Sequence, residues 1–196
     1  EYTPEEDIAE EAPEEQDVRK YRRKELRDQI GIVPQKAVLF AGTVRENMQW
    51  GKKDATDEEI WEALKTAQAE EFIRAKEGGL DANIEQGGRN LSGGQRQRLT
   101  IARALVKKPR VLILDDSASA LDYATDAALR KAIRQMEGAP TVFIVSQRTS
   151  SLMSADRILV LDDGETTGYG THEELLKNCQ TYREIYNSQY GKKEEA

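Results

Sequence analysis

The residue pattern best suited to chemistry is a run of five: Leu91, Ser92, Gly93, Gly94 and Gln95. It places a hydroxyl and two glycines where a helix is predicted to begin. Several free backbone N–H groups at such a start can bind one anion, because glycine allows close approach and the helix dipole favours negative charge. A serine-glycine linker with a fortuitous cap would have the same sequence, so phosphate binding and a plain linker both stay open at this point.

A second pattern places two adjacent carboxylates after an apolar run. Asp115 and Asp116 follow Val111–Leu114, which is typical of a strand buried on both faces. Ligands of open α/β sheets bind at the carboxyl ends of the strands. One carboxylate could therefore hold Mg²⁺ through water, and the other could orient a nucleophilic water. A buried strand that merely ends in a polar turn is the alternative, and the pair alone does not exclude it.

Hydrophobic spacing predicts the elements that position these groups. Thr56 with Glu59 forms a capping box at the start of one helix, and another helix begins near Ser92. Beyond residue 110, strands and helices alternate, which is typical of a doubly wound parallel sheet and an α/β fold. A turn at Asp163-Gly164 and a helix capped by Thr171 follow. The predicted helices cover residues 56–77, 92–107 and 124–136, and the predicted strands cover 29–35, 111–114, 141–145 and 158–161.

Composition limits the class of protein. Residues 1–18 contain nine carboxylates and neither Lys nor Arg, whereas the other 178 residues contain 27 acidic and 29 basic side chains. We therefore expect an acidic, disordered leader before a near-neutral body, and no nucleic-acid partner. Apolar runs of four or five residues predict no membrane-spanning helix. One cysteine, Cys179, and one histidine, His172, exclude an internal disulfide and a zinc cluster.

Together with three further segments, the two patterns resemble the nucleotide-binding domain of ABC transporters of the exporter type. Residues 91–95 match the family signature, and residues 111–116 match the Walker B strand. The other segments resemble the D-loop (Ser119–Asp122), the Q-loop region (Val33–Gln35 with Leu39–Asn47) and the last helix (Gly170–Leu175). The likeness runs from about residue 17 to residue 190.

The resemblance implies a P-loop NTPase fold of the ABC type, with a parallel sheet and a helical subdomain. Residues 19–190 would form a partial ATP-binding domain after the leader of residues 1–18. Its parts would be a helical subdomain at about 43–107, a core sheet at 108–170 and C-terminal helices at 171–190, with 191–196 as a tail.

The resemblance further implies a subunit that couples ATP binding and hydrolysis to export across a membrane. In the family, two such domains close over two ATP molecules. Ser92–Gln95 would then bind the γ-phosphate of an ATP held mainly by the partner domain. Asp115 would hold Mg²⁺ through water, Gln35 would contact the metal and the attacking water, and Asp122 would communicate across the interface.

Two positions depart from the family pattern. Asp116 stands where the catalytic glutamate is expected, and its carboxylate is one methylene, roughly 1.5 Å, short, where misplacements near 1 Å can cost on the order of 10²-fold in rate. Gln147 stands where the switch histidine is expected and cannot carry a positive charge. Both changes beside an intact signature indicate the degenerate subunit of a heterodimeric exporter. The expected partners are a second nucleotide-binding domain and the transmembrane domain, assembled at the cytoplasmic face of the plasma membrane.

The phosphate-binding loop of the family is missing, because no Gly-x-x-x-x-Gly-Lys-Ser/Thr run occurs in the sequence. The residue that stacks on adenine cannot be assigned for the same reason. We therefore expect a truncated or rearranged chain that is cytoplasmic and hydrolyses ATP negligibly by itself. The missing strand would lie between 141–145 and 158–161, and two apolar strand edges would be left unpaired.

Two other functions are considered. A non-catalytic module could present its signature face to a partner ATPase and regulate it without turnover. A DNA-repair or chromosome-structure ATPase shares the signature, but such chains carry long heptad-bearing insertions that this sequence lacks. The exported substrate cannot be read from the sequence.

Overall fold

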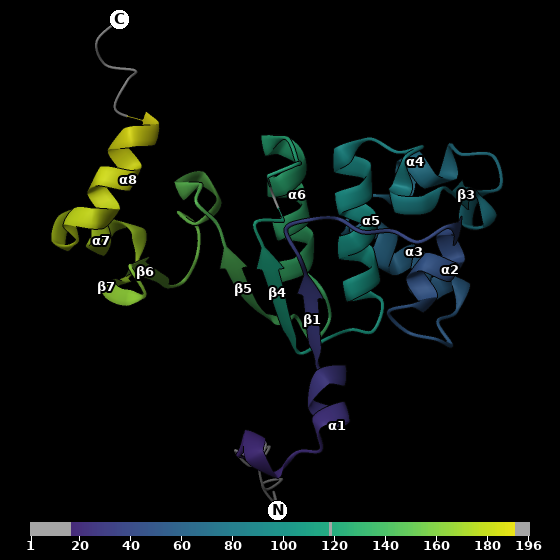
Figure 1. Ribbon diagram of the computed structural model, residues 1–196, viewed down its shortest axis with the longest axis horizontal. Coiled ribbons are helices and arrows are strands. Elements are labelled where there is room, and N and C mark those ends of the chain that lie inside the picture. The colour runs from purple at the N-terminus through teal and green to yellow at the C-terminus, as the bar shows by residue number, and fades with distance from the viewer. Residues whose placement is uncertain (1–16, 118, 191–196) are drawn as a thin grey trace, which may run out of the picture.

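The computed structural model describes residues 17–117 and 119–190 (Figure 1). A larger body, which contains a three-stranded sheet, and a smaller C-terminal unit each bury an apolar core of their own. The predicted tail, and all of the predicted leader except residues 17 and 18, lie outside the described residues. No described helix is both long enough and apolar enough to cross a membrane.

The sheet of the larger body is parallel, as the sequence predicts. Strand β4 (Val111–Asp115) lies between β1 (Ile30–Val33) and β5 (Thr141–Val145). The strand predicted within residues 29–35 ends at Val33, because Pro34 has no N–H with which to continue the ladder, as the sequence predicts. The fold class is therefore α/β as predicted, and the structure shows which strands are neighbours, β1 with β4 and β4 with β5.

The two faces of this sheet differ in how well they are covered. Successive side chains of a strand point to opposite faces, and the register aligns Ile32 of β1 with Phe143 of β5 through the middle strand. Leu112 and Leu114 face the other way and are buried in the main core. Ile32, Phe143 and Val145 are instead 60%, 58% and 56% exposed. The described residues therefore cover one face of the sheet and leave the other largely open.

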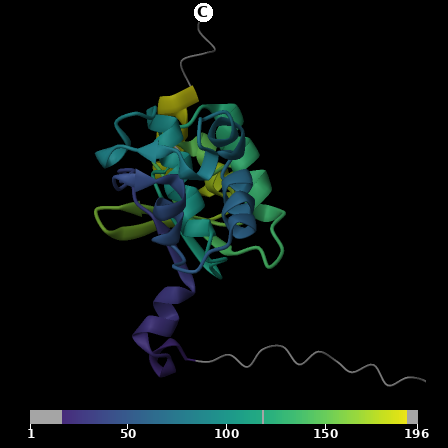
Figure 2. The ribbon, with the colours of Figure 1, turned by 90° about the vertical axis from the view of Figure 1, so that its right-hand side faces the viewer.

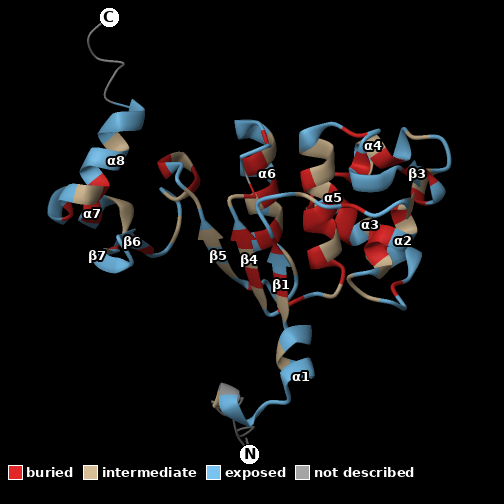
Figure 3. Ribbon diagram, viewed as in Figure 1, coloured by how far each residue is buried: buried red, intermediate tan, exposed pale blue. Residues whose placement is uncertain are grey.

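Helices supply the covered side. Figure 3 shows the buried residues concentrated in α5 (Gly93–Leu105), α3 (Asp57–Thr66) and β4. Helix α1 (Arg23–Asp28) buries none of its residues and projects from the body in Figure 2. The other elements of the body are α2 (Val44–Gln49), α4 (Glu70–Arg74), α6 (Tyr123–Arg134), the hairpin β2 (Gly42–Thr43) with β3 (Asn83–Ile84), and the 3-10 turns η1 (Val18–Lys20), η2 (Gly79–Asp81), η3 (Gln86–Gly88) and η4 (Thr149–Ser151).

The single helix predicted over residues 56–77 is wrong, because the chain turns after α3. The predicted cap at Thr56 is confirmed, but Gln68 adopts a left-handed conformation with φ 58° and separates α3 from α4. The turn buries Ala67 and Ala69 completely. Arg98 of α5 donates a 2.6 Å hydrogen bond to the carbonyl that the turn frees at Gln68. Tertiary packing thus outweighs the helical propensity of this segment.

The C-terminal unit corrects the predicted place of residues 158–161. They form β6 (Ile158–Asp162), which pairs antiparallel with β7 (Glu165–Gly170) and not with the parallel sheet. The predicted turn at Asp163-Gly164 explains this pairing, since φ is 47° and 82° at its two residues and such turns close two-residue hairpins. Helix α7 (His172–Asn178), capped by Thr171 as predicted, and helix α8 (Gln180–Tyr190) pack on the hairpin.

Candidate functional site

In the first turn of α5, Ser92 and Gly93 are exposed and Gly94 is half-buried. Ser92 is the N-cap, and its Oγ accepts a hydrogen bond from the Gln95 N–H at 3.2 Å. The Gln95 side chain in turn accepts from the Ser92 N–H at 3.0 Å, which completes a capping box. The N–H groups of Gly93 and Gly94 have no partner within the helix, because they belong to its first turn. They are the donors left for an anion.

The backbone of the segment before α5 is held by hydrogen bonds from the Arg96 side chain. Leu91 is buried, and Arg96 donates to its carbonyl oxygen at 2.6 Å and to that of Gly88 at 3.3 Å. Gly88 has φ 66°, and a Cβ there would lie 2.8 Å from Arg96 Cδ. Glycine is therefore required at this position, and Arg96 holds the chain that leads into the exposed turn.

The two carboxylates leave the end of β4 in different environments. Asp115 is exposed as the last residue of the strand. Asp116 has φ 41°, although its N–H still donates to Val145 of β5 at 2.8 Å. Gln35 Nε2 donates a 3.1 Å hydrogen bond to Asp116 Oδ2. The fold thus brings together Gln35 and Asp116, which are 81 residues apart in the sequence.

The segment after Asp116 is fixed at both ends. The N–H and the hydroxyl of Ser119 both donate to the Asp116 carbonyl, at 3.2 and 2.9 Å. Asp122 is the N-cap of α6 and accepts hydrogen bonds from the backbone N–H and the hydroxyl of Thr125, at 2.9 and 2.7 Å. These bonds, the backbone one first, hold the pKa of Asp122 below its usual value. Asp122 therefore stays ionised well into the acidic range.

The start of α5 lies against this same segment. A Cβ on Gly94 would be 3.2 Å from the carbonyl oxygen of Ala120. The exposed turn that carries Ser92 and the loop that carries Asp122 are thus in contact within one chain. A displacement of either segment would therefore alter its contact with the other.

Gln147 is a predicted site residue whose side chain forms no hydrogen bond with the other described site residues. It is exposed, and no described residue hydrogen-bonds to its side chain. Its carbonyl oxygen accepts from Gln189 of α8 at 2.7 Å. The next residue, Arg148, donates to the Ser119 carbonyl at 3.2 Å. The segment that carries Gln147 therefore contacts α8 through its backbone and reaches the segment after Asp116 through Arg148.

The carboxylates fit Mg²⁺ in the way that nucleotide sites use it. Among the described residues, no group of three or more His, Cys, Asp or Glu side chains could form a metal cage. Mg²⁺ in phosphate sites keeps several waters and binds one or two carboxylates together with phosphate oxygens. Asp115 and Asp116, with the amide of Gln35, offer such a partial set of oxygen ligands.

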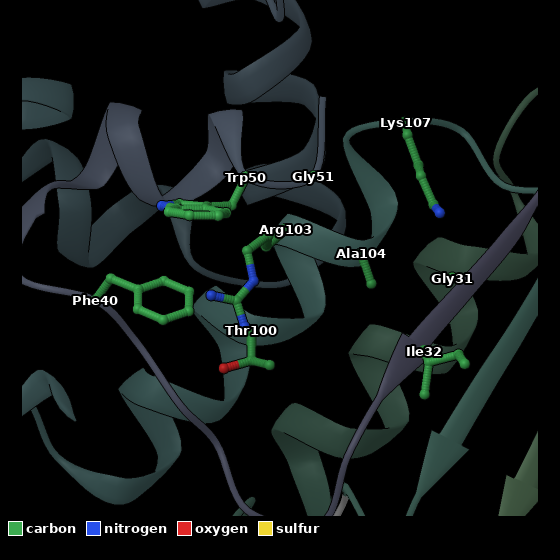
Figure 4. A pocket seen from close by; sticks show the side chains of 9 residues that line it. All are labelled: Gly31, Ile32, Phe40, Trp50, Gly51, Thr100, Arg103, Ala104 and Lys107. Carbon is green, nitrogen blue, oxygen red and sulfur yellow. The ribbon is translucent and has the colours of Figure 1, made fainter. Parts of the chain in front are cut away.

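A groove of about 290 Å³, lined by residues of β1, the C-terminal half of α5 and the segment around Trp50, was not predicted from the sequence (Figure 4). Trp50 is 69% exposed, and its ring lies 4.9 Å from that of Phe40. Figure 4 shows the Arg103 side chain reaching toward these rings and Lys107 farther along the groove. Burial lowers the pKa of Arg103 and of Lys107. Trp50, an aromatic residue in a largely polar stretch, was the signal that could have marked this surface.

The chain is similar to proteins of one family. The sequence profile of the ABC transporter family matches residues 2–119. The chain is 50% identical over 167 residues to the uncharacterized ABC transporter ATP-binding protein YfiB of Bacillus subtilis (strain 168), with 85% of this chain and 29% of YfiB covered. It is 48% identical over 164 residues to the probable multidrug resistance ABC transporter ATP-binding/permease protein YheI of the same organism, with 84% of this chain and 28% of YheI covered.

A solved structure shows the same fold. The structure of a bacterial Atm1-family ABC exporter with ATP bound matches with a TM-score of 0.79 at 37% identity, over 83% of this chain and 29% of that one. The chain thus spans less than a third of the length of these relatives. The family match begins at residue 2, earlier than residue 17, where the likeness was expected to begin.

Proposed function

Because the chain belongs to the ABC transporter family, in which it is an ATP-binding cassette, we propose that it couples ATP binding and hydrolysis to the export of a substrate across a membrane. The observation that carries this proposal is the exposed first turn of α5, where the N–H groups of Gly93 and Gly94 are left free by a capping box. Helix N-termini of this kind bind phosphate.

Each cluster of residues has a part in that function. When bound, Mg²⁺-ATP supplies the phosphoryl group whose transfer to water releases the energy. Ser92, Gly93 and Gly94 bind the γ-phosphate of an ATP that a second nucleotide-binding domain holds. At the ends of the chain's own strands, Asp115 would hold Mg²⁺ through water, and Gln35 would contact the metal and orient the attacking water. Asp122, ionised beside the signature turn, transmits contact between the two domains.

The chain is the slow half of a heterodimeric pair. Asp116 is shorter than the glutamate that the family uses as a base, and its Oδ2 already accepts a hydrogen bond from Gln35. Gln147 is neutral where the family carries a histidine. The complete site is therefore the one formed by this chain's signature and the partner's phosphate-binding loop.

The groove beside Trp50 supports a second contact, with the transmembrane domain. Relatives of this chain are described as ATP-binding/permease proteins, so a membrane-spanning partner is the expected neighbour. Exposed Trp50 and Phe40 offer an apolar contact, and Arg103 and Lys107 offer positive charge. The assembled chain would lie at the cytoplasmic face of the membrane.

The decisive experiment replaces Ser92 in the assembled exporter that contains this chain. Ser92→Arg fills the phosphate-binding turn with a bulky side chain, and we expect ATP hydrolysis and substrate transport to fall at least tenfold. Ala139→Arg, in an exposed loop before β5, is the matched control and should change neither. The isolated chain should release phosphate at the background rate. Full hydrolysis by the Ser92→Arg exporter would overturn the proposal.

A further inference from the structure

One side chain of the C-terminal unit hydrogen-bonds to the backbone of the segment Gln147–Thr149, called the gripped segment below. Gln189, near the end of α8, donates from Nε2 to the Gln147 carbonyl oxygen at 2.7 Å. Its Oε1 accepts from the backbone N–H of Thr149 at 3.0 Å and from the Thr149 hydroxyl at 2.9 Å. The single amide thus makes three hydrogen bonds, placed on both sides of Arg148.

This contact joins two parts of the molecule with separate cores. Gln189 is 42 residues beyond Gln147 and 40 beyond Thr149. Helix α8 packs on α7 and the β6–β7 hairpin, whereas the gripped segment follows β5 of the main sheet. Thr149 is buried, so its backbone donor would be costly to leave unpaired. The position of α8 therefore affects the path of the chain after β5.

The gripped segment is connected to the site by further hydrogen bonds. Arg148 donates to the carbonyl of Ser119, and Ser119 donates twice to the carbonyl of Asp116. Asp116 in turn accepts from Gln35. Hydrogen bonds, joined by short stretches of backbone, therefore connect α8 to Asp116 at the end of β4.

The residue type suits this task. A carboxamide can donate on one side and accept on the other at the same time, whereas a carboxylate at neutral pH only accepts. Gln180 on the same helix makes a different kind of bond, since it donates to Glu184 within α8. Gln180 therefore provides a matched control for a glutamine of α8 that does not reach the body.

We propose that Gln189 is a positioning residue that sets the place of Gln147 by fixing the backbone on either side of Arg148, so that the C-terminal unit controls how Gln147 meets the nucleotide. The contact with nucleotide rests on the proposed function. The hydrogen bonds from Gln189 to the backbone do not rest on it. The backbone hydrogen bonds and the effect on nucleotide are therefore measured in separate experiments.

The first measurement is amide hydrogen exchange in the full chain. Gln189→Ala removes all three bonds, so the Thr149 amide should exchange about tenfold faster, and the Ser119 amide should also lose protection. Gln189→Glu keeps the acceptor and should largely preserve Thr149. Gln180→Ala should change neither amide. Wild-type exchange at Thr149 in Gln189→Ala would overturn the proposal.

The second measurement is a double-mutant cycle in the assembled exporter. If Gln189 acts through Gln147, the losses of ATP affinity at this chain's own, slow site in Gln147→Ala and Gln189→Ala should not add, because coupled residues show an interaction energy. Additive losses would overturn the positioning role. Should Ser92→Arg leave hydrolysis intact, the proposed function fails, while the exchange result at Thr149 still decides whether Gln189 holds the backbone.

Discussion

The region around α5 and the region around β5 differ in how completely the chain covers them. Side chains such as Ile60, Leu64 and Leu99 are fully buried between α3, α5 and their neighbours. On β5, Phe143 and Val145 are more than half exposed. The same contrast holds on the C-terminal hairpin, whose outward side chains include Leu159, Leu161 and Tyr169, each more than half exposed.

This difference separates two kinds of site residue. The signature turn begins a helix that is packed into the core of the larger body, so many buried contacts hold it in place. Gln147 follows β5, beside an open sheet face, and its backbone depends on Gln189 from a distant unit. Such a segment is easier to move, because few buried contacts oppose the change.

The largest effect expected from this comparison is at Leu99. Leu99→Ala removes a fully buried side chain from α5, and the cavity should lower the free energy of unfolding by about 3 kcal/mol. Urea unfolding followed by far-ultraviolet circular dichroism measures the change. A loss below about 1 kcal/mol would show that the α5 region is less tightly packed than its burial indicates.

An intermediate effect is expected at Asp122, as a dependence on pH. Its pKa is lowered in the folded chain, so its contribution to stability is present above its unfolded value, near 3.8, and is lost as pH falls through the lower folded value. Asp122→Asn keeps a capping side chain but cannot titrate. The difference in unfolding midpoint between wild type and Asp122→Asn should therefore shrink with acidification. A difference that is constant with pH would contradict this assignment.

The smallest effect on stability is expected at Phe143. Phe143→Thr replaces an aromatic residue with a β-branched one, and both types are favoured in strands. It removes only an exposed ring, so the free energy of unfolding should change by less than about 1 kcal/mol. Self-association of the isolated chain, measured by light scattering, should decrease because an exposed apolar patch becomes smaller. A stability loss as large as that of Leu99→Ala would show that the two regions are equally packed.

Local rules predicted the parts of the site that depend on nearest neighbours in sequence. The cap at Ser92, the helix after it and the strand over residues 111–114 are all confirmed, and the strand extends one residue further, to Asp115. The break between α3 and α4 at Gln68 could not be predicted, because no glycine or proline marks it. The burial of one alanine on each side, Ala67 and Ala69, accompanies the turn there. The pairing of β6 with β7 was missed, although the Asp163-Gly164 turn carried the signal.

The sequence by itself determined the family, the helix start that offers backbone donors, and the two unusual residues Asp116 and Gln147. These depend on residue type and short spacing, which a linear pattern records. Only the tertiary structure decided that Gln35 meets Asp116, that a groove opens beside Trp50, and that Gln189 holds the segment of Gln147. Those contacts join residues tens of positions apart, and packing of whole elements, not local preference, brings them together.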